Sequence, residues 1–280
     1  MGAAGALSNA LIPFAPTLDA GSEDAVIPKL PSRVYARRTH AKIPFLTGTN
    51  GDKGTLFSSF TSNYTTTEIR EDLINSLRPS ELAQDELESI IDQVLELYPD
   101  ESALGSPYGT GNETFGSSSR FKRFSSIGAF RLGSIISCGT PVLTGLPEGG
   151  DKNFQSGRKQ LNRLSSDCDD GVKSWEYVFT DPQSVPFLRV RSNLTLGLGS
   201  PANRTGALEL SKVMVDYWIS FAVGLDPNDG KGSKRPVWEE YSVNCPTVLQ
   251  LENGNTSNVA DDYGEGAMDL FLDNPVAFRH

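Results

Sequence analysis

Three short apolar runs stand out along a chain that is otherwise rich in polar residues. They cover residues 43–47, 175–180 and 248–251. Continuous apolar runs of this length are typical of strands that are covered on both faces, as in a parallel sheet. Gly48 closes the first run, and a tight polar turn follows it. The pattern therefore predicts three buried β-strands.

Amphipathic stretches between these runs predict helices. Residues 68–77 and 81–98 place apolar side chains three and four positions apart, which gathers them on one helical face. A third helix is indicated over residues 121–135. The stretch 207–225 predicts the clearest helix, and we expect it to be mostly buried because its polar residues form one narrow stripe: Glu209, Lys212, Asp216 and Ser220.

The order of these elements predicts the fold class. Buried strands that alternate with amphipathic helices are typical of the α/β class with a largely parallel sheet. Residues 1–42 predict an irregular entry segment, and residues 139–173, rich in Gly, Asp, Lys and Ser, predict a long loop between elements. Three strands are few for 280 residues. Either further strands lie within the loops, or the chain is part of a larger fold.

Charge and composition exclude several classes of partner. The net charge of -10 argues against nucleic-acid binding, which requires a concentrated basic surface. The most apolar window, 207–225, contains three charged residues and cannot span a membrane. The sequence has no His/Cys cluster with the spacing of a zinc site and no dinucleotide-binding glycine loop, so we expect no cofactor. Spacing leaves open which pair among the three cysteines, Cys138, Cys168 and Cys245, forms a disulfide.

Five Asn-x-Ser/Thr sequons favour a secreted, glycosylated protein. They lie at Asn63, Asn112, Asn193, Asn203 and Asn255. The first residues, MGAAGALSNALIPFAP, lack the basic and apolar regions of a signal peptide, so a secretory signal would have to lie upstream of Met1.

Candidate chemistry lies in the loops that follow the predicted strands, because ligand and catalytic groups of α/β sheets cluster there. These loops are 49–55 and 181–196. Asp52 in the first loop is interpreted as a turn former beside two glycines, with a catalytic carboxylate as the alternative. His40 precedes the first strand and His280 ends the chain, so neither is placed for catalysis. No G-x-S-x-G nucleophile elbow occurs.

Two acidic pairs are candidates for general acid/base chemistry. They are Asp169-Asp170 and Asp261-Asp262. Both are interpreted as solvated acids, because adjacent carboxylates in polar segments are usually exposed.

Several segments together resemble the carboxyl-terminal part of the type B carboxylesterase and lipase family, from about residue 14 to the end. FAPTLDA resembles the entry motif of that family, IPFLTGTNGDKGTLF its strand and acid turn, and IIDQVLELYP a helix before a Tyr-Pro stop. VPFLRVRSNLTL resembles the histidine loop. DYWISFAVGLDPNDG followed by RPVWEEY resembles the closing helix and Trp-Tyr segment. The resemblance implies that residues 1–280 form the C-terminal part of an α/β-hydrolase fold.

The resemblance also places the family's catalytic positions in this sequence. The glutamate that orients the histidine falls on Lys53, and the histidine itself falls on Ser192. A lysine cannot stabilise an imidazolium, and a serine hydroxyl is not a base near neutral pH. Asp52 is a weak substitute for the acid, since it comes one residue earlier in a tight turn and should point elsewhere.

These replacements favour a non-catalytic protein whose role is binding a protein partner or the missing amino-terminal half of the fold. The alternative is the carboxyl-terminal half of an active serine ester hydrolase, and only this reading includes an ester substrate. A decayed copy without a selected role is a third reading. In a secreted protein, a glycan on Asn193 would sit where substrate would pass.

Overall fold

The computed structural model describes most of the chain from residue 24 onward. The described residues are 24–26, 28–29, 33–34, 37–39, 41–52, 54, 63–77, 79–106, 108–114, 119–127, 155–166, 172–181 and 204–278. Their strands are β1 (Phe45–Asn50), β2 (Ser174–Phe179), β3 (Thr247–Leu251) and β4 (Ser257–Ala260). Their helices are α3 (Thr66–Leu77), α4 (Gln84–Leu97), η1 (Ser102–Leu104), α5 (Ser119–Ile127), α6 (Ser156–Ser166), α7 (Arg204–Gly224), α8 (Glu265–Asp273) and α9 (Pro275–Phe278).

The four strands form one sheet in the order β1-β2-β3-β4. β1, β2 and β3 are parallel, and β4 pairs antiparallel with β3. The α/β class with a mostly parallel sheet is therefore confirmed. The three predicted strands are present, while β4 was not predicted, because its sequence SNVA lacks an apolar run.

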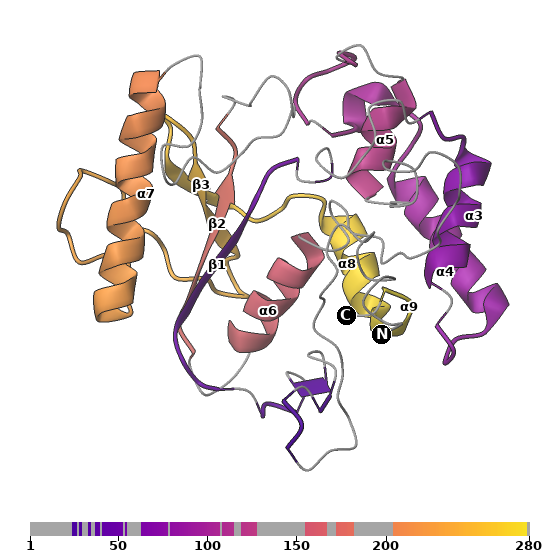
Figure 1. Cartoon of the computed structure of the whole chain (residues 1–280), viewed down its shortest axis with the longest axis horizontal. Coiled ribbons are helices and arrows are strands. Elements are labelled where there is room, and N and C mark those ends of the chain that lie inside the picture. The colour runs from indigo at the N-terminus through magenta and orange to yellow at the C-terminus, as the bar shows by residue number, and fades with distance from the viewer. Residues whose placement is uncertain are drawn as a thin grey trace, which may run out of the picture.

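The two faces of β2 differ in chemistry, because successive side chains of a strand point to opposite sides. Trp175, Tyr177 and Phe179 pack on the side of α7, where Trp175 meets Phe221 with ring centroids 5.8 Å apart. On the other side Glu176 forms an ion pair with Arg158 of α6. α7 and α6 accordingly lie on opposite sides of the strands (Figure 1). One face of the sheet has an aromatic core, and the other has a polar one.

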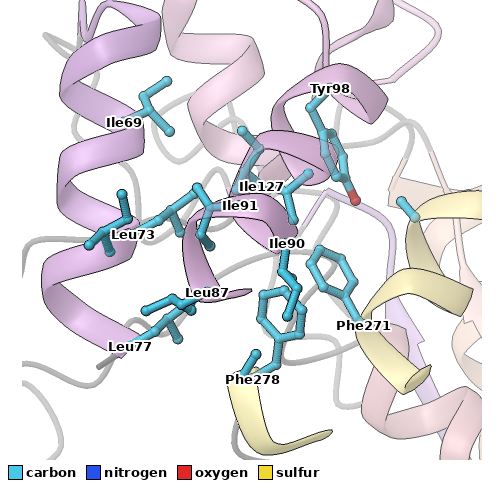
Figure 2. Packing of buried hydrophobic residues seen from close by; sticks show 14 of the residues in the cluster. Ile69, Leu73, Leu77, Leu87, Ile90, Ile91, Tyr98, Ile127, Phe271 and Phe278 are labelled. Carbon is cyan, nitrogen blue, oxygen red and sulfur yellow. The ribbon is translucent and has the colours of Figure 1, made fainter. Parts of the chain in front are cut away.

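Away from the sheet, a second apolar core joins α3, α4, α8 and α9 (Figure 2). The predicted stripes of α3 and α4 lie in this core, and Ile69, Leu77 and Ile91 are fully buried. Phe271 and Phe278 pack edge to face, with ring centroids 4.8 Å apart. The stripes that the sequence predicted are thus confirmed as the inner faces of this helical layer.

Helix α3 begins with a threonine cap. Thr65 Oγ1 accepts a hydrogen bond from the Glu68 backbone N–H at 3.2 Å, and the Thr65 N–H donates to Glu68 Oε2 at 2.7 Å. This reciprocal pair is a capping box, which satisfies two backbone donors at the helix start.

Two sequence predictions need correction. Helix α6 lies within 139–173, which was predicted to be a loop; the pattern missed it because its buried face carries polar residues: Ser156, Arg158, Lys159, Asn162 and Ser165. Helix α7 was predicted to be mostly buried, but only the face toward the sheet is. Ile219 and Val223 on its other face are 56% and 83% exposed.

The third predicted helix is confirmed as α5 up to Ile127, and its remainder lies outside the described residues.

Candidate functional site

The carboxyl ends of β1 and β2 lie side by side, because the two strands are parallel and Asn50 pairs with Phe179. The Gly51 N–H donates to the Phe179 carbonyl at 2.8 Å and joins the first turn to the end of β2. Asp52 follows β1, and Asp181 follows β2. This edge of the sheet is where the sequence predicted chemistry, and it carries two buried carboxylates.

Asp52 has its carboxylate turned into the protein. It is 5% exposed and adopts a left-handed backbone conformation with φ of 61°. Its Oδ1 accepts hydrogen bonds from the Ser106 hydroxyl and from the Tyr108 N–H, both at 2.8 Å. Asp52 thus connects the turn after β1 to the segment around η1. The left-handed backbone of Asp52 fits the turn-former interpretation.

Lys122 of α5 lies in the same region and is fully buried. Its Nζ donates to Thr110 Oγ1 at 2.8 Å and to the Gly111 carbonyl at 2.6 Å. Burial lowers the pKa of Lys122, while the negative charges of Asp52 and Glu113 act in the opposite direction. The lysine ammonium therefore stabilises the loop over 108–114 and contributes positive charge beside the Asp52 carboxylate.

Asp181 holds the end of β2 to the turn between β3 and β4. It is fully buried, and its Oδ2 accepts a hydrogen bond from the Asn253 N–H at 2.9 Å. Its carboxylate therefore has a structural partner, as Asp52 does.

A cavity of about 460 Å³ lies between the end of α4 and the start of α8. Its walls are mainly apolar and include Tyr98, Leu104, Tyr108 and Tyr263. Tyr108 and Tyr263 pack edge to face at 5.3 Å. Cavities of this size with mostly apolar walls suit small molecules.

Arg123 supplies the positive charge at this cavity, but its guanidinium is committed to the fold. Nε donates to the Tyr98 carbonyl at 2.5 Å, Nη2 to the Leu95 carbonyl at 3.1 Å, and Nη1 to Thr66 Oγ1 at 2.7 Å. The two carbonyls belong to the last turn of α4, which has no basic residue of its own. Arg123 therefore satisfies helix-end carbonyls from a distant element.

Four buried ionisable groups form a second polar cluster, which the sequence did not predict. Arg158 pairs with Glu176 and, through Nη2, with Asp261 Oδ1 at 2.9 Å. Lys159 Nζ donates to the Asp261 carbonyl oxygen at 2.9 Å. Asp261 was predicted to be solvated, and that prediction is wrong: it is 8% exposed, because the cations of α6 compensate its charge. Its neighbour Asp262 is exposed, as predicted.

One sequence signal could have revealed this cluster. The buried polar residues of α6 recur at helical spacing, at positions 155, 158, 159, 162 and 165. A helical period carried by polar residues is easily taken for a loop, because the usual indicator is an apolar stripe.

Several predicted site residues lie outside the described residues. They are Lys53, Ser192, Asn193, Asn203, His40, His280, Cys138, Cys168 and the pair Asp169-Asp170. Asn63, Asn112 and Asn255 are described, and all three are exposed. Cys245 is exposed and has a free thiol.

Among the described residues, no group of His, Cys, Asp or Glu is arranged to hold a metal ion. Within the same part of the chain, no helix is long and apolar enough to cross a membrane.

Two esterases of known structure share this arrangement of strands and helices. Aspergillus niger EstA superposes with a TM-score of 0.66 at 14% identity, over 92% of this chain and 45% of that one. PNB esterase gives a TM-score of 0.53 at 17% identity, over 87% of this chain and 41% of that one. The fold is therefore that of an α/β-hydrolase, of which this chain has a part.

Comparison with known sequences identifies relatives of this chain among the fungal lipases. A secreted triacylglycerol lipase of Gibberella zeae is 26% identical over 262 residues, which is 90% of this chain and 38% of the lipase. Lipase 2 of Geotrichum candidum is 27% identical over 247 residues, 85% of this chain and 36% of the lipase. No family model matches the chain. The chain is homologous to fungal lipases and carboxylesterases, and it spans less than two fifths of the length of either lipase.

Proposed function

We propose that this chain is a non-catalytic relative of the carboxylesterases and lipases, with a role in binding rather than hydrolysis. The observation that carries the proposal is the orientation of Asp52. It is the described carboxylate nearest the family's acid position, and its Oδ1 already accepts hydrogen bonds from Ser106 and Tyr108. It is therefore held for the fold and is poorly placed to orient a catalytic histidine.

The replaced positions support the same reading. Lys53 stands where the resemblance puts the acid, and Ser192 where it puts the histidine. Loss of a single triad member costs orders of magnitude in rate, so two replacements together leave little hydrolysis.

The test is hydrolysis of p-nitrophenyl butyrate and p-nitrophenyl palmitate by the purified chain, together with labelling by a fluorophosphonate that reacts with activated serines. We expect no turnover above that of the heat-unfolded sample and no label. Turnover that copurifies with the chain and disappears after fluorophosphonate treatment would contradict the proposal.

The second candidate is that the chain supplies the carboxyl-terminal half of an active serine ester hydrolase. The coverage of the fungal lipases favours it, since the match extends over 36–38% of their length. Intact mass and amino-terminal sequencing of the native protein test it. A native protein of about 30 kDa that begins at Met1 and copurifies with no second chain rejects it. A longer protein with a G-E-S-A-G segment upstream, or a second chain that carries this segment, supports it.

We also propose an extracellular location, because two of the relatives are named secreted lipases. Asn63, Asn112 and Asn255 are exposed sequon positions and could accept glycans. A mass decrease of the native protein after glycosidase treatment is expected, and an unchanged mass would count against secretion through a glycosylating pathway.

A further inference from the structure

Helix α6 is attached to the sheet by charged groups instead of apolar side chains. It contacts β1, β2 and α8, and its buried side chains are all polar. Arg158 is 5% exposed, and Lys159 is fully buried. Each apolar side chain that a helix buries normally stabilises its docking. None of the fully buried side chains of α6 makes that contribution, so its docking depends strongly on the charge state of the groups that face it.

Glu176 on β2 is the carboxylate that α6 covers, and it is fully buried. Its Oε1 meets Arg158 Nη1, whereas its Oε2 has no hydrogen-bond donor within the part of the chain that the structure describes. Arg158 also forms an ion pair with Asp261 through Nη2, so two carboxylates share one guanidinium. An oxygen of a buried carboxylate without a donor is a natural position for a proton.

Among the described residues, the other ionisable groups near Glu176 do not remove this preference for a proton. Lys159 points to Asp261, with 3.4 Å between Nζ and Oδ1. Tyr241 contributes no charge below alkaline pH, because burial raises its pKa to about 12. Burial raises the pKa of Glu176 to about 7, with Arg158 and Lys159 acting against that shift and Asp261 adding to it. Burial thus outweighs the cationic neighbours.

Arg163, further along α6, is a further charge on this side within the part of the chain that the structure describes. Its Nη1 is 2.7 Å from Asp269 Oδ1 of α8, and that pair is partly exposed. It therefore links α6 to α8 in the same way whether or not Glu176 carries a proton.

We propose that docking of α6 against the sheet is coupled to protonation of Glu176, so that α6 is held more firmly at mildly acidic pH than at alkaline pH. When α6 leaves the sheet, water reaches Glu176 and its pKa returns toward the usual range near 4.5. Between that range and pH 7 the Glu176 carboxyl binds up to one proton more in the docked state than in the undocked state. Acidification through this window consequently favours docking, and alkalinisation weakens it.

Linkage gives the size of the effect. The undocking constant changes by at most tenfold for each pH unit within the window, so from pH 8 to pH 5 we expect a decrease of about 100-fold.

Hydrogen–deuterium exchange of the full chain tests the proposal. Protection of residues 155–166, corrected for the intrinsic pH dependence of exchange, should increase as the pH falls from 8 to 5. The variant Glu176→Gln, which carries no charge, should show the same protection at both pH values. The control Asp262→Asn, on an exposed carboxylate, should behave like the unchanged protein. Equal protection at pH 5 and pH 8 in the unchanged protein, or an undiminished pH dependence in Glu176→Gln, would overturn the proposal.

A second measurement is independent of whether Glu176→Gln folds. In the unchanged protein labelled with ¹³C at glutamate side-chain carbons, the Glu176 carboxyl signal should titrate near pH 7. A midpoint near 4.5 would overturn the proposal, because docking would then take up no proton.

Discussion

Replacing Asp52 should reduce stability, because its carboxylate accepts two hydrogen bonds in a buried site. Hydrogen bonds to a charged group contribute about 1.5–3 kcal/mol each. Asp52 has a left-handed backbone, which glycine adopts without strain, so the change to glycine recovers about 1 kcal/mol of this loss. We therefore expect Asp52→Gly to lower the free energy of unfolding by about 2–5 kcal/mol. Asp52→Asn keeps an oxygen acceptor and tolerates the same backbone, so about 1–2 kcal/mol is expected.

The assay is urea unfolding followed by circular dichroism, with Asp262→Ala as the matched control. Asp262 is exposed, and its removal should leave the midpoint unchanged. If Asp52→Gly were as stable as Asp262→Ala, the Ser106 and Tyr108 hydrogen bonds would contribute nothing, and the structural role assigned to Asp52 would be wrong. If Asp52→Gly instead abolished a measured hydrolytic activity while leaving stability intact, Asp52 would be catalytic.

Two further substitutions test other parts of the fold. Arg123→Met removes the side chain that donates to the Leu95 and Tyr98 carbonyls, so it should lower the free energy of unfolding by about 2–4 kcal/mol. The control Arg120→Met removes a partly exposed ion pair with Asp100 and should change the free energy of unfolding little. Equal effects of the two substitutions would refute the capping role of Arg123. Gly48→Ala places a methyl group against the Tyr177 ring and should lower the free energy of unfolding, measured by heat or urea, by about 1–3 kcal/mol. In the control Gly157→Ala the new methyl group has open space on α6, so the change should be neutral or stabilising. An unchanged stability of Gly48→Ala would show that Tyr177 can move.

The sequence predicted those elements whose buried faces are apolar. Helices α3 and α4 could be recognised because their isoleucines and leucines recur at helical spacing. Helix α6 could not, since it turns Arg158 and Lys159 inward. Strand β4 was missed for a related reason: it is four residues long and its side chains are half-buried or exposed.

The candidate site was predictable in position and unpredictable in detail. Loops after parallel strands are expected to carry functional groups, so Asp52 could be singled out from the sequence. Its hydrogen-bond partners are 54 and 56 residues away, on a segment with no motif of its own. The ion pair between Arg158 and Asp261 spans 103 residues. Such contacts depend on how the elements pack, and no local pattern encodes them.

The chain has three tryptophans, and all of them lie in the aromatic core between the sheet and α7: Trp175, Trp218 and Trp238. Trp238 contacts Tyr177, Tyr217 and Trp218, and its indole N–H donates to the Glu176 carbonyl at 2.9 Å. The helical layer of α3, α4, α8 and α9 contains none. Intrinsic fluorescence therefore reports on one of the two cores only. A fluorescence transition that precedes or follows the loss of helical circular dichroism would reveal that the chain does not melt as a single cooperative unit.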